Sequence, residues 1–230
     1  MDIQKMSLPD LSQAVVLEEQ ELDRNEAWNK VRMDKFTSSN VYKLMTYLDK
    51  PDVLPKGAIT YIEEIVIAIK TNGQGIENVT SYAMDHGTEK EPFAVARFEK
   101  EKGVECYAIG DKQEFVTLCS YFGGTPDGLF GIDDLIEVKC PNSKTHFSNL
   151  RELVDVESFK KKYPQYYGQI QGNLLATGRK TGWFISYDDR FVNEKDQILI
   201  LEVPRDEDYI TKLKKRLTLA EAYKKQLLAD

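Results

Sequence analysis

The sequence predicts an α+β (α/β-type) fold in which a mixed central β-sheet is flanked by helices and preceded by a mainly helical part. Apolar residues recur at helical spacing over residues 1–102, and strand-like alternation begins only after residue 103. Strands and helices then follow each other without the strict alternation of a parallel array. No repeat, low-complexity tract or linker divides the chain. We therefore expect a single domain over residues 1–230, with a helical part at 1–102 and an α/β core at 103–230.

Four helices are expected in the first part. The first covers Asp10 to Arg24, and the second starts at Ser38 or Ser39, either of which can cap it, and carries the apolar residues of 41–48. Apolar side chains between Ile62 and Ile69 repeat at helical spacing in the third. The fourth covers Val79 to Lys102 and should bend or restart at Pro92, because proline lacks the amide proton and crowds the preceding turn.

The core begins where the apolar period changes to two. Val104–Ile109 and Glu114–Ser120 are predicted to form a hairpin that turns near Gly110-Asp111, and a turn-rich segment at residues 123–128 then leads to a third strand. The further elements expected are, in order, a strand at Leu135–Cys140, a helix at Glu157–Thr177, strands at Trp183–Tyr187 and Ile198–Val203, and a closing amphipathic helix at Asp206–Leu228.

Composition limits the classes of function. With a formal net charge of -7 and no apolar run near the ~20 residues that cross a bilayer, the chain reads as soluble, without membrane partners. Its first ten residues carry acids where a signal peptide needs a basic start, so we expect a cytoplasmic protein. Three widely spaced cysteines and two histidines leave oxygen ligands for any metal, which favours magnesium, manganese or calcium.

Asp127, Glu137 and Lys139 form the most informative set of residues. Glu137 and Lys139 are two apart on a predicted strand, so their side chains project from the same face. Asp127 lies in the turn that enters this strand and can fold back towards the same point. Two carboxylates can hold a hard divalent cation, and an adjacent ammonium can orient or help deprotonate water, as hydrolysis of a phosphodiester requires.

A purely structural interpretation exists for each of these residues. Aspartate after proline is common in turns, and Glu-Val-Lys is an ordinary half-exposed strand with a same-face ion pair. Arg32 fits a solvated helix face, Ser39 a helix cap, and Glu91 a surface glutamate. Tyr166 and Gln169 could simply belong to the mixed face of one helix. The interpretation changes when further motifs are considered together.

Six short motifs occur in a fixed order along the chain. They are Trp28-x-Lys30-x-Arg32 with Thr37-Ser38-Ser39, Gly87-x-x-x-Glu91, Pro126-Asp127-Gly128-Leu129, Glu137-Val138-Lys139-Cys140-Pro141, Tyr166-x-x-Gln169-x-Gln171, and Trp183-Phe184. In this order the chain resembles the PD-(D/E)xK nuclease superfamily, and more closely the family of lambda-type exonucleases and YqaJ-like viral recombinases. The resemblance runs from about Trp28 into the final helix and implies the superfamily's restriction-endonuclease-like core.

The resemblance also implies a role for each matched residue. Asp127, Glu137, the backbone carbonyl of Val138 and Glu91 would hold the metal, and Lys139 would position or activate the attacking water. Arg32 and Ser39 match the groups that hold the 5′-phosphate of the strand end, while Tyr166 and Gln169 match a helix motif that supports the active site. Pro92 departs from the lambda enzyme, whose helix continues without proline, and this puts the direction of the Glu91 side chain in doubt.

The activity implied is a 5′-to-3′ exonuclease that requires Mg²⁺, or Mn²⁺ in its place, and degrades one strand of double-stranded DNA to leave a 3′ overhang. The implied context is phage-type homologous recombination, with a single-strand annealing protein as partner and a trimeric ring as the assembly. A ring would retain DNA despite the negative net charge. Water would attack phosphorus directly, since no histidine is placed to activate a covalent nucleophile.

Three other interpretations remain. A structure- or sequence-specific endonuclease of the same superfamily would share the metal site but lack the end-binding matches at Arg32 and Ser39. A catalytically silent DNA-binding module would have no need of two converging carboxylates. An iron–sulfur nuclease is disfavoured because three cysteines cannot supply four thiolates.

Basic residues at Lys160–Lys162 and at 212–216 fit either solvated helix faces or contacts to the DNA backbone.

Overall fold

The centre of the molecule is a pair of β-sheets. The computed structural model describes residues 27–47, 49–50, 52–75 and 82–229. A four-stranded sheet has the order β4 (Gly128–Phe130), β5 (Asp134–Lys139), β6 (Thr181–Tyr187) and β7 (Ile198–Pro204). Its inner pair, β5 and β6, is parallel and both outer pairs are antiparallel, so the predicted mixed sheet is confirmed. A small second sheet joins β1 (Phe36–Thr37), β3 (Phe122–Gly124) and β2 (Val116–Cys119).

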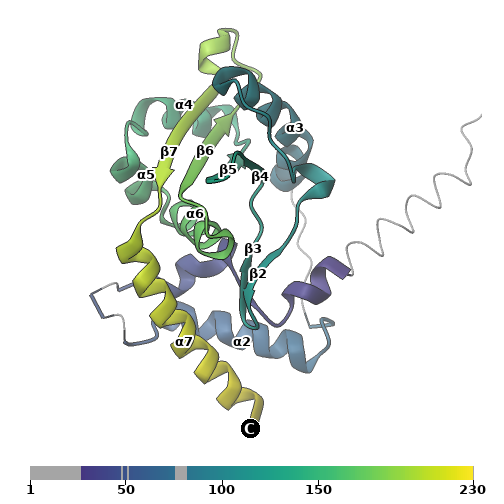
Figure 1. Ribbon diagram of the computed structural model, residues 1–230, viewed down its shortest axis with the longest axis vertical. Helices are drawn as coiled ribbons and strands as arrows, with labels where there is room; N and C mark the ends of the chain where they lie inside the picture. Colours follow the sequence, from purple (N-terminus) through teal and green to yellow (C-terminus); the bar gives the residue numbers. More distant parts are fainter. Residues whose placement is uncertain (1–26, 48, 51, 76–81, 230) are drawn as a thin grey trace, which may run out of the picture.

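Helices cover both faces of the four-stranded sheet. On one face α3 (Tyr82–Lys102) packs Ala94, Val95 and Phe98 against Ile136 and other apolar residues of the strands. On the other face lie α4 (Ser143–Glu152), α5 (Val156–Lys162) and α6 (Pro164–Thr177). Figure 1 shows this three-layer arrangement, with α6 between the four-stranded sheet and the lower helices. Alternation along β5 therefore sends Ile136 and Val138 towards α3, and Glu137 and Lys139 towards α6.

The N-terminal helices pack against the C-terminal helix. A 3-10 helix, η1 (Ser38–Leu44), lies against α6, and α2 (Lys56–Lys70) lies beside α7 (Glu207–Ala229) at the lower end of the molecule. Arg216 of α7 is 1% exposed and donates hydrogen bonds to the backbone carbonyls of Leu44, Thr46, Tyr47 and Lys50. It holds the loop after η1 to α7 and is a structural residue, which corrects its grouping with possible DNA contacts.

The predicted hairpin of Val104–Ile109 with Glu114–Ser120 is wrong. Residues 104–109 form no strand and contribute only an isolated bridge between Tyr107 and Leu129. The second segment does contain β2, but β2 pairs with β3 in antiparallel register. Gly110 to Lys112 form a short 3-10 helix, η2, instead of a hairpin turn. The strand that pairs with β2 lies later in the chain, and its glycines belong to the segment predicted to be only a turn.

Helix boundaries differ from the predictions at four places. The helix at Ser38 is a 3-10 helix whose N-cap residue is Thr37, and Ser39 lies inside it without a capping hydrogen bond. Pro92 does not restart α3, which continues from Tyr82 to Lys102. Pro164, at the first position of α6, separates it from α5, and α4 was not predicted. The expected helix at Asp10–Arg24 lies outside the described residues.

The other long elements agree with the sequence. The predicted helix through Ile62–Ile69 is α2, the three late strands are β5, β6 and β7, and the closing helix is α7. Among the described residues, no helix combines the length and apolar character that a membrane crossing needs.

Candidate active site

Asp127 and Glu137 are brought together by the pairing of β4 with β5. The backbone N–H of Asp127 donates to the carbonyl of Ile136 (3.2 Å), and the Asp127 carboxylate accepts a hydrogen bond from the backbone N–H of Val138 (2.6 Å). Asp127 therefore lies across from the residues that flank Glu137. Glu137 is fully buried, and Asp127, which has 16% of its side chain exposed, lines a recess.

Lys139 completes the cluster on the same face of β5. Its ammonium forms a short ion pair with Glu137 Oε1, lies 3.9 Å from Asp127 Oδ2, and donates to the carbonyl oxygen of Val138 (3.1 Å). The same ammonium lies over the ring of Tyr166, 5.2 Å from its centroid. The structure thus brings together Asp127, Glu137, Val138, Lys139 and Tyr166, as the sequence predicted.

The acids of this cluster are hard to ionise. Burial, and then the charge of Asp127, raise the pKa of Glu137 to about 8, although Lys139 acts in the opposite direction. Burial also raises the pKa of Asp127, against the effects of Lys139 and of the Val138 amide. Burial opposes the charge of Lys139, but Glu137 and Asp127 outweigh it and raise the pKa of this ammonium. A further positive charge in the cluster would therefore stabilise the ionised carboxylates.

Glu91 approaches the cluster from α3, which packs on the opposite face of the sheet. Burial, followed by repulsion from Asp127, raises the pKa of Glu91 to about 7. Gln113 donates one hydrogen bond to Glu91 Oε1 (2.7 Å) and another to the backbone carbonyl of Asp127 (3.2 Å). Glu91 therefore interacts with the cluster despite the neighbouring Pro92. Gln113 bridges the gap between Glu91 and Asp127.

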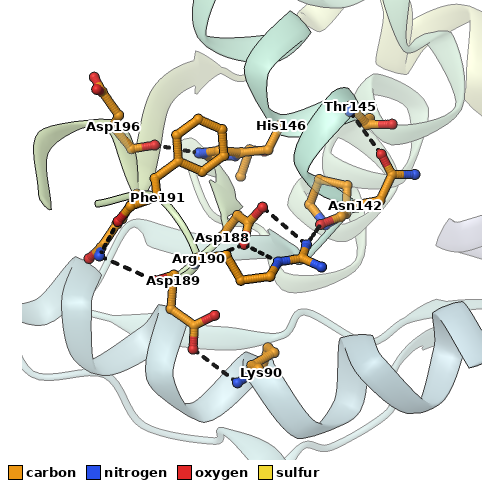
Figure 2. Close-up of polar contacts among 12 residues, drawn as sticks. Lys90, Asn142, Thr145, His146, Asp188, Asp189, Arg190, Phe191 and Asp196 are labelled. Atoms are coloured by element: carbon orange, nitrogen blue, oxygen red, sulfur yellow. Dashed lines mark hydrogen bonds and ion pairs between the residues drawn. The ribbon is translucent and has the colours of Figure 1, made fainter. Parts of the chain in front are cut away.

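An ion pair fixes this part of α3 to the loop after β6. Lys90 Nζ lies 2.9 Å from Asp189 Oδ2, and Figure 2 shows the two side chains meeting beneath the paired Asp188 and Arg190. On the opposite side of Asp188 from Lys90, the buried His146 contacts Ser186 Oγ through Nδ1 (2.8 Å) and the Asp196 carbonyl through Nε2 (2.8 Å) (Figure 2). Both ring nitrogens have hydrogen-bond partners within the fold, so His146 has a structural role.

A cavity of about 410 Å³ opens from Asp127 towards the N-terminal helix. Among its walls are Gln169 from α6, Ser39 from η1, and Arg32 and Trp28 from the helical residues 27–32. The Arg32 guanidinium lies 5.3 Å from the ring of Trp28 and 5.9 Å from that of Phe115, and burial lowers its pKa. Within the described part of the chain, Arg32 has no carboxylate partner, so its charge remains available to an anion in the cavity.

The donor set of this site fits a hard cation. Carboxylate oxygens of Asp127 and Glu137 and the Val138 carbonyl are the ligand type that Mg²⁺ and Mn²⁺ prefer. No cluster of three acidic, histidine or cysteine side chains with metal-binding geometry occurs within residues 27–229 as far as they are described. The most compact set of candidate metal ligands therefore consists of two carboxylates, one carbonyl and water molecules. Glu91 lies farther from this set, on the other side of Gln113.

Comparison with known proteins agrees with this geometry. The profile of the YqaJ-like viral recombinase domain matches residues 27–180, which is more than half of the chain. The chain belongs to this family. Its structure is similar to that of an alkaline exonuclease, LHK-Exo, from Laribacter hongkongensis (TM-score 0.74, 30% identity, 89% of this chain and 94% of that chain). The same enzyme in complex with dAMP gives a TM-score of 0.73 at 29% identity over the same shares.

A third structure supports the fold. A phage-related exonuclease from Haemophilus somnus 129PT has a TM-score of 0.68 at 16% identity, covering 85% of this chain and 95% of that chain. A search of curated protein sequences found no match. The predicted family and the predicted PD-(D/E)xK-type fold are confirmed. The chain is homologous to alkaline exonucleases, which are DNA nucleases.

Two polar residues of the site were missed from the sequence. Gln113 bridges Glu91 and Asp127, and Asn173 of α6 donates to Glu137. Neither belongs to a local motif, and the residues that they contact are 14 to 48 positions away. Of the basic runs, Lys160 is paired with Asp206 and Lys162 with Glu152, so these two lysines are occupied within the fold.

Proposed function

We propose that this family member is a Mg²⁺-dependent exonuclease that degrades one strand of double-stranded DNA from its 5′ end and leaves a 3′ overhang. One observation carries the proposal. The cavity that begins at Asp127, beside the Glu137–Lys139 pair, ends at an arginine without a carboxylate partner in the described chain. An acidic cluster that suits a cation and a cationic end that suits a phosphate thus share one recess, as a nuclease acting at a strand end requires.

The acidic end is suited to phosphodiester hydrolysis. We assign the metal-binding role to Asp127, Glu137, the Val138 carbonyl and Glu91. Mg²⁺ bound there would offset the charge that builds on the phosphate oxygens in the transition state. Lys139 has a raised pKa and therefore stays an ammonium, so it acts as a donor that orients the attacking water. Tyr166 lies against this ammonium and Gln169 lines the cavity, which supports their assignment to positioning.

The cationic end is suited to the terminal phosphate. A guanidinium presents planar donors to phosphate oxygens, and partial desolvation strengthens such a charge-assisted contact. Ser39 lies in the same wall, with its hydroxyl 3.1 Å from that of Thr37, and can add a neutral donor. We therefore assign binding of the 5′-phosphate to Arg32 and Ser39, which gives the enzyme its dependence on a strand end.

The proposal also includes a biological role, a partner and an assembly. Membership of a viral recombinase family and similarity to a phage-related exonuclease support a role in phage-type recombination. The enzyme would act in the cytoplasm, and a single-strand annealing protein would load onto the 3′ overhang. A net charge of -7 disfavours retention on DNA by diffuse attraction, which supports a ring-shaped trimer as the working assembly.

The test is a time course on linear duplex DNA labelled separately at each end, with and without Mg²⁺, beside a closed circular duplex. We expect nucleotides to be released from the 5′ end only with Mg²⁺, and the circle to stay intact. Cleavage of the circle would replace the proposal with an endonuclease.

Two variants separate catalysis from binding. Asp127→Ala should abolish nucleotide release while keeping DNA binding. Asp133→Ala serves as the matched control because, among the described residues, the Asp133 side chain pairs with the exposed Lys180 alone, near the far end of β5. Unchanged release by Asp127→Ala would remove this aspartate from the mechanism. An inactive parent protein that still binds DNA would identify a silent binding module.

A further inference from the structure

Asn173 is a buried amide at the back of the acidic cluster. It lies on α6, has no exposed surface, and uses its side-chain N–H groups on two acceptors. One is Glu137 Oε2 (3.5 Å) and the other is the backbone carbonyl of Thr125 (3.3 Å). Since Lys139 pairs with the other oxygen of Glu137, each oxygen of this carboxylate has one partner in the described structure.

The orientation of the amide is determined by these acceptors. Turning the group over would place Oδ1 against a carboxylate and a carbonyl, both of which repel it. In the orientation found, Oδ1 is buried without a hydrogen-bond partner among the described residues. Leaving a buried acceptor unpaired is unfavourable, so the two donated contacts determine how Asn173 is placed.

The backbone around Asn173 is shaped to admit it. A Cβ atom on Gly124 would lie 2.3 Å from Asn173 Oδ1 and 2.2 Å from Ser38 Oγ, so only glycine fits at that position. A Cβ atom on Gly172 would lie 2.9 Å from the same serine oxygen. These two glycines let α6 approach β3 and η1 closely enough for the short Asn173 side chain to reach Thr125.

We infer that Asn173 is a positioning residue that fixes the distance between the two metal-binding carboxylates. Thr125 precedes Asp127 by two residues, so the amide joins the segment that carries one carboxylate to the side chain of the other. Asn173 would thereby hold the pocket in shape before a divalent cation enters, as groups that support metal ligands do elsewhere. The inference rests on the proposed function, because it assumes that these carboxylates bind the metal.

The test measures binding of Mn²⁺ to the full chain without DNA, from the electron paramagnetic resonance signal of free Mn²⁺. Asn173→Leu keeps the volume of the side chain and removes its donors. Asn149→Leu is the matched control, because Asn149 is 2% exposed and contacts Ser186 and Tyr163 but no carboxylate. We expect the dissociation constant to rise about 10- to 100-fold in Asn173→Leu and to change by less than about twofold in the control. Thermal unfolding in chelator should show comparable losses in both.

The outcomes are distinct. Mn²⁺ affinity equal to that of the parent in Asn173→Leu, or an equal loss in Asn149→Leu, would overturn the inference while leaving the nuclease proposal in place. A parent protein that neither binds Mn²⁺ nor cleaves DNA would overturn the proposed function itself. If Asn173→Leu does not fold, Asn173→Ser provides the same test, because serine is too short to reach both acceptors and should weaken Mn²⁺ binding in the same direction.

Discussion

Replacing Glu137 with glutamine should remove a large part of the pH dependence of stability in the metal-free protein. The pKa of this buried carboxyl is raised from 4.5 to about 8. Between these two values the folded state keeps a proton that the unfolded state releases, so the free energy of unfolding falls as the pH rises. The raised pKa of Lys139 adds a stabilising contribution that is present below 10.5 and is therefore constant over this range.

The size of the effect follows from the width of the pKa shift. One proton of difference changes the free energy of unfolding by about 1.4 kcal/mol per pH unit. Allowing for partial titration near both ends, the parent should lose on the order of 3.5 kcal/mol between pH 5 and pH 8 through Glu137. The Glu137→Gln variant should keep the pH dependence that comes from Glu91, whose pKa is raised to about 7, and from Asp127, whose pKa burial also raises.

The measurement is urea unfolding at several pH values in EDTA, repeated with excess Mg²⁺. Because a divalent cation favours the ionised carboxylates, Mg²⁺ should flatten the curve of the parent and leave that of Glu137→Gln nearly unchanged. A parent whose stability in EDTA is constant from pH 5 to pH 8 would refute the reasoning. So would an equal slope in the parent and the variant, since another group would then be responsible.

Three further predictions concern single side chains. Lys139→Met should reduce the cleavage rate at least about 100-fold, as loss of one oriented donor does elsewhere, while DNA affinity in Ca²⁺ stays within a few-fold of the parent. Arg32→Ala should reduce the preference for a 5′-phosphorylated over a 5′-hydroxyl end by roughly 10- to 100-fold in competition assays, and a parent without such a preference would contradict the assignment. Arg216→Leu should lower the free energy of unfolding by at least about 3 kcal/mol in urea, because it leaves buried carbonyls unpaired; a loss below about 1 kcal/mol would show that water replaces the guanidinium.

The acidic cluster could be predicted from the sequence because its geometry is local. Two-residue spacing on a strand places Glu137 and Lys139 on one face, and the pairing of β4 with β5 returns Asp127 to the same point. Long amphipathic helices such as α2 and α7 could also be predicted, because the helical spacing of their apolar residues is visible in the sequence without knowledge of what they pack against. These features depend on residues that are close in the chain.

Other features depend on partners that are distant in the chain. The buried side chains of α4 are His146 and Asn149, both polar, so no apolar period marks this helix. β2 was paired with the wrong segment because the competing strand, β3, is rich in glycine and reads as a turn. Asn173 and Gln113 gain their roles only when α6 and η2 come to lie beside the cluster.

Arg216 and Arg32 differ in what surrounds their guanidinium groups. Arg216 donates to four carbonyl oxygens and lies against the body of the protein, so its hydrogen-bonding capacity is largely used in the fold. Arg32 is partly buried, lies near the rings of Trp28 and Phe115 and lines a cavity, with no carboxylate beside it in the described chain. Burying an unpaired charge is unfavourable unless an anion completes the site. The environment of Arg32 is therefore compatible with an anionic ligand, and its place in the same recess as Asp127 is the basis for the proposed contact with a terminal phosphate.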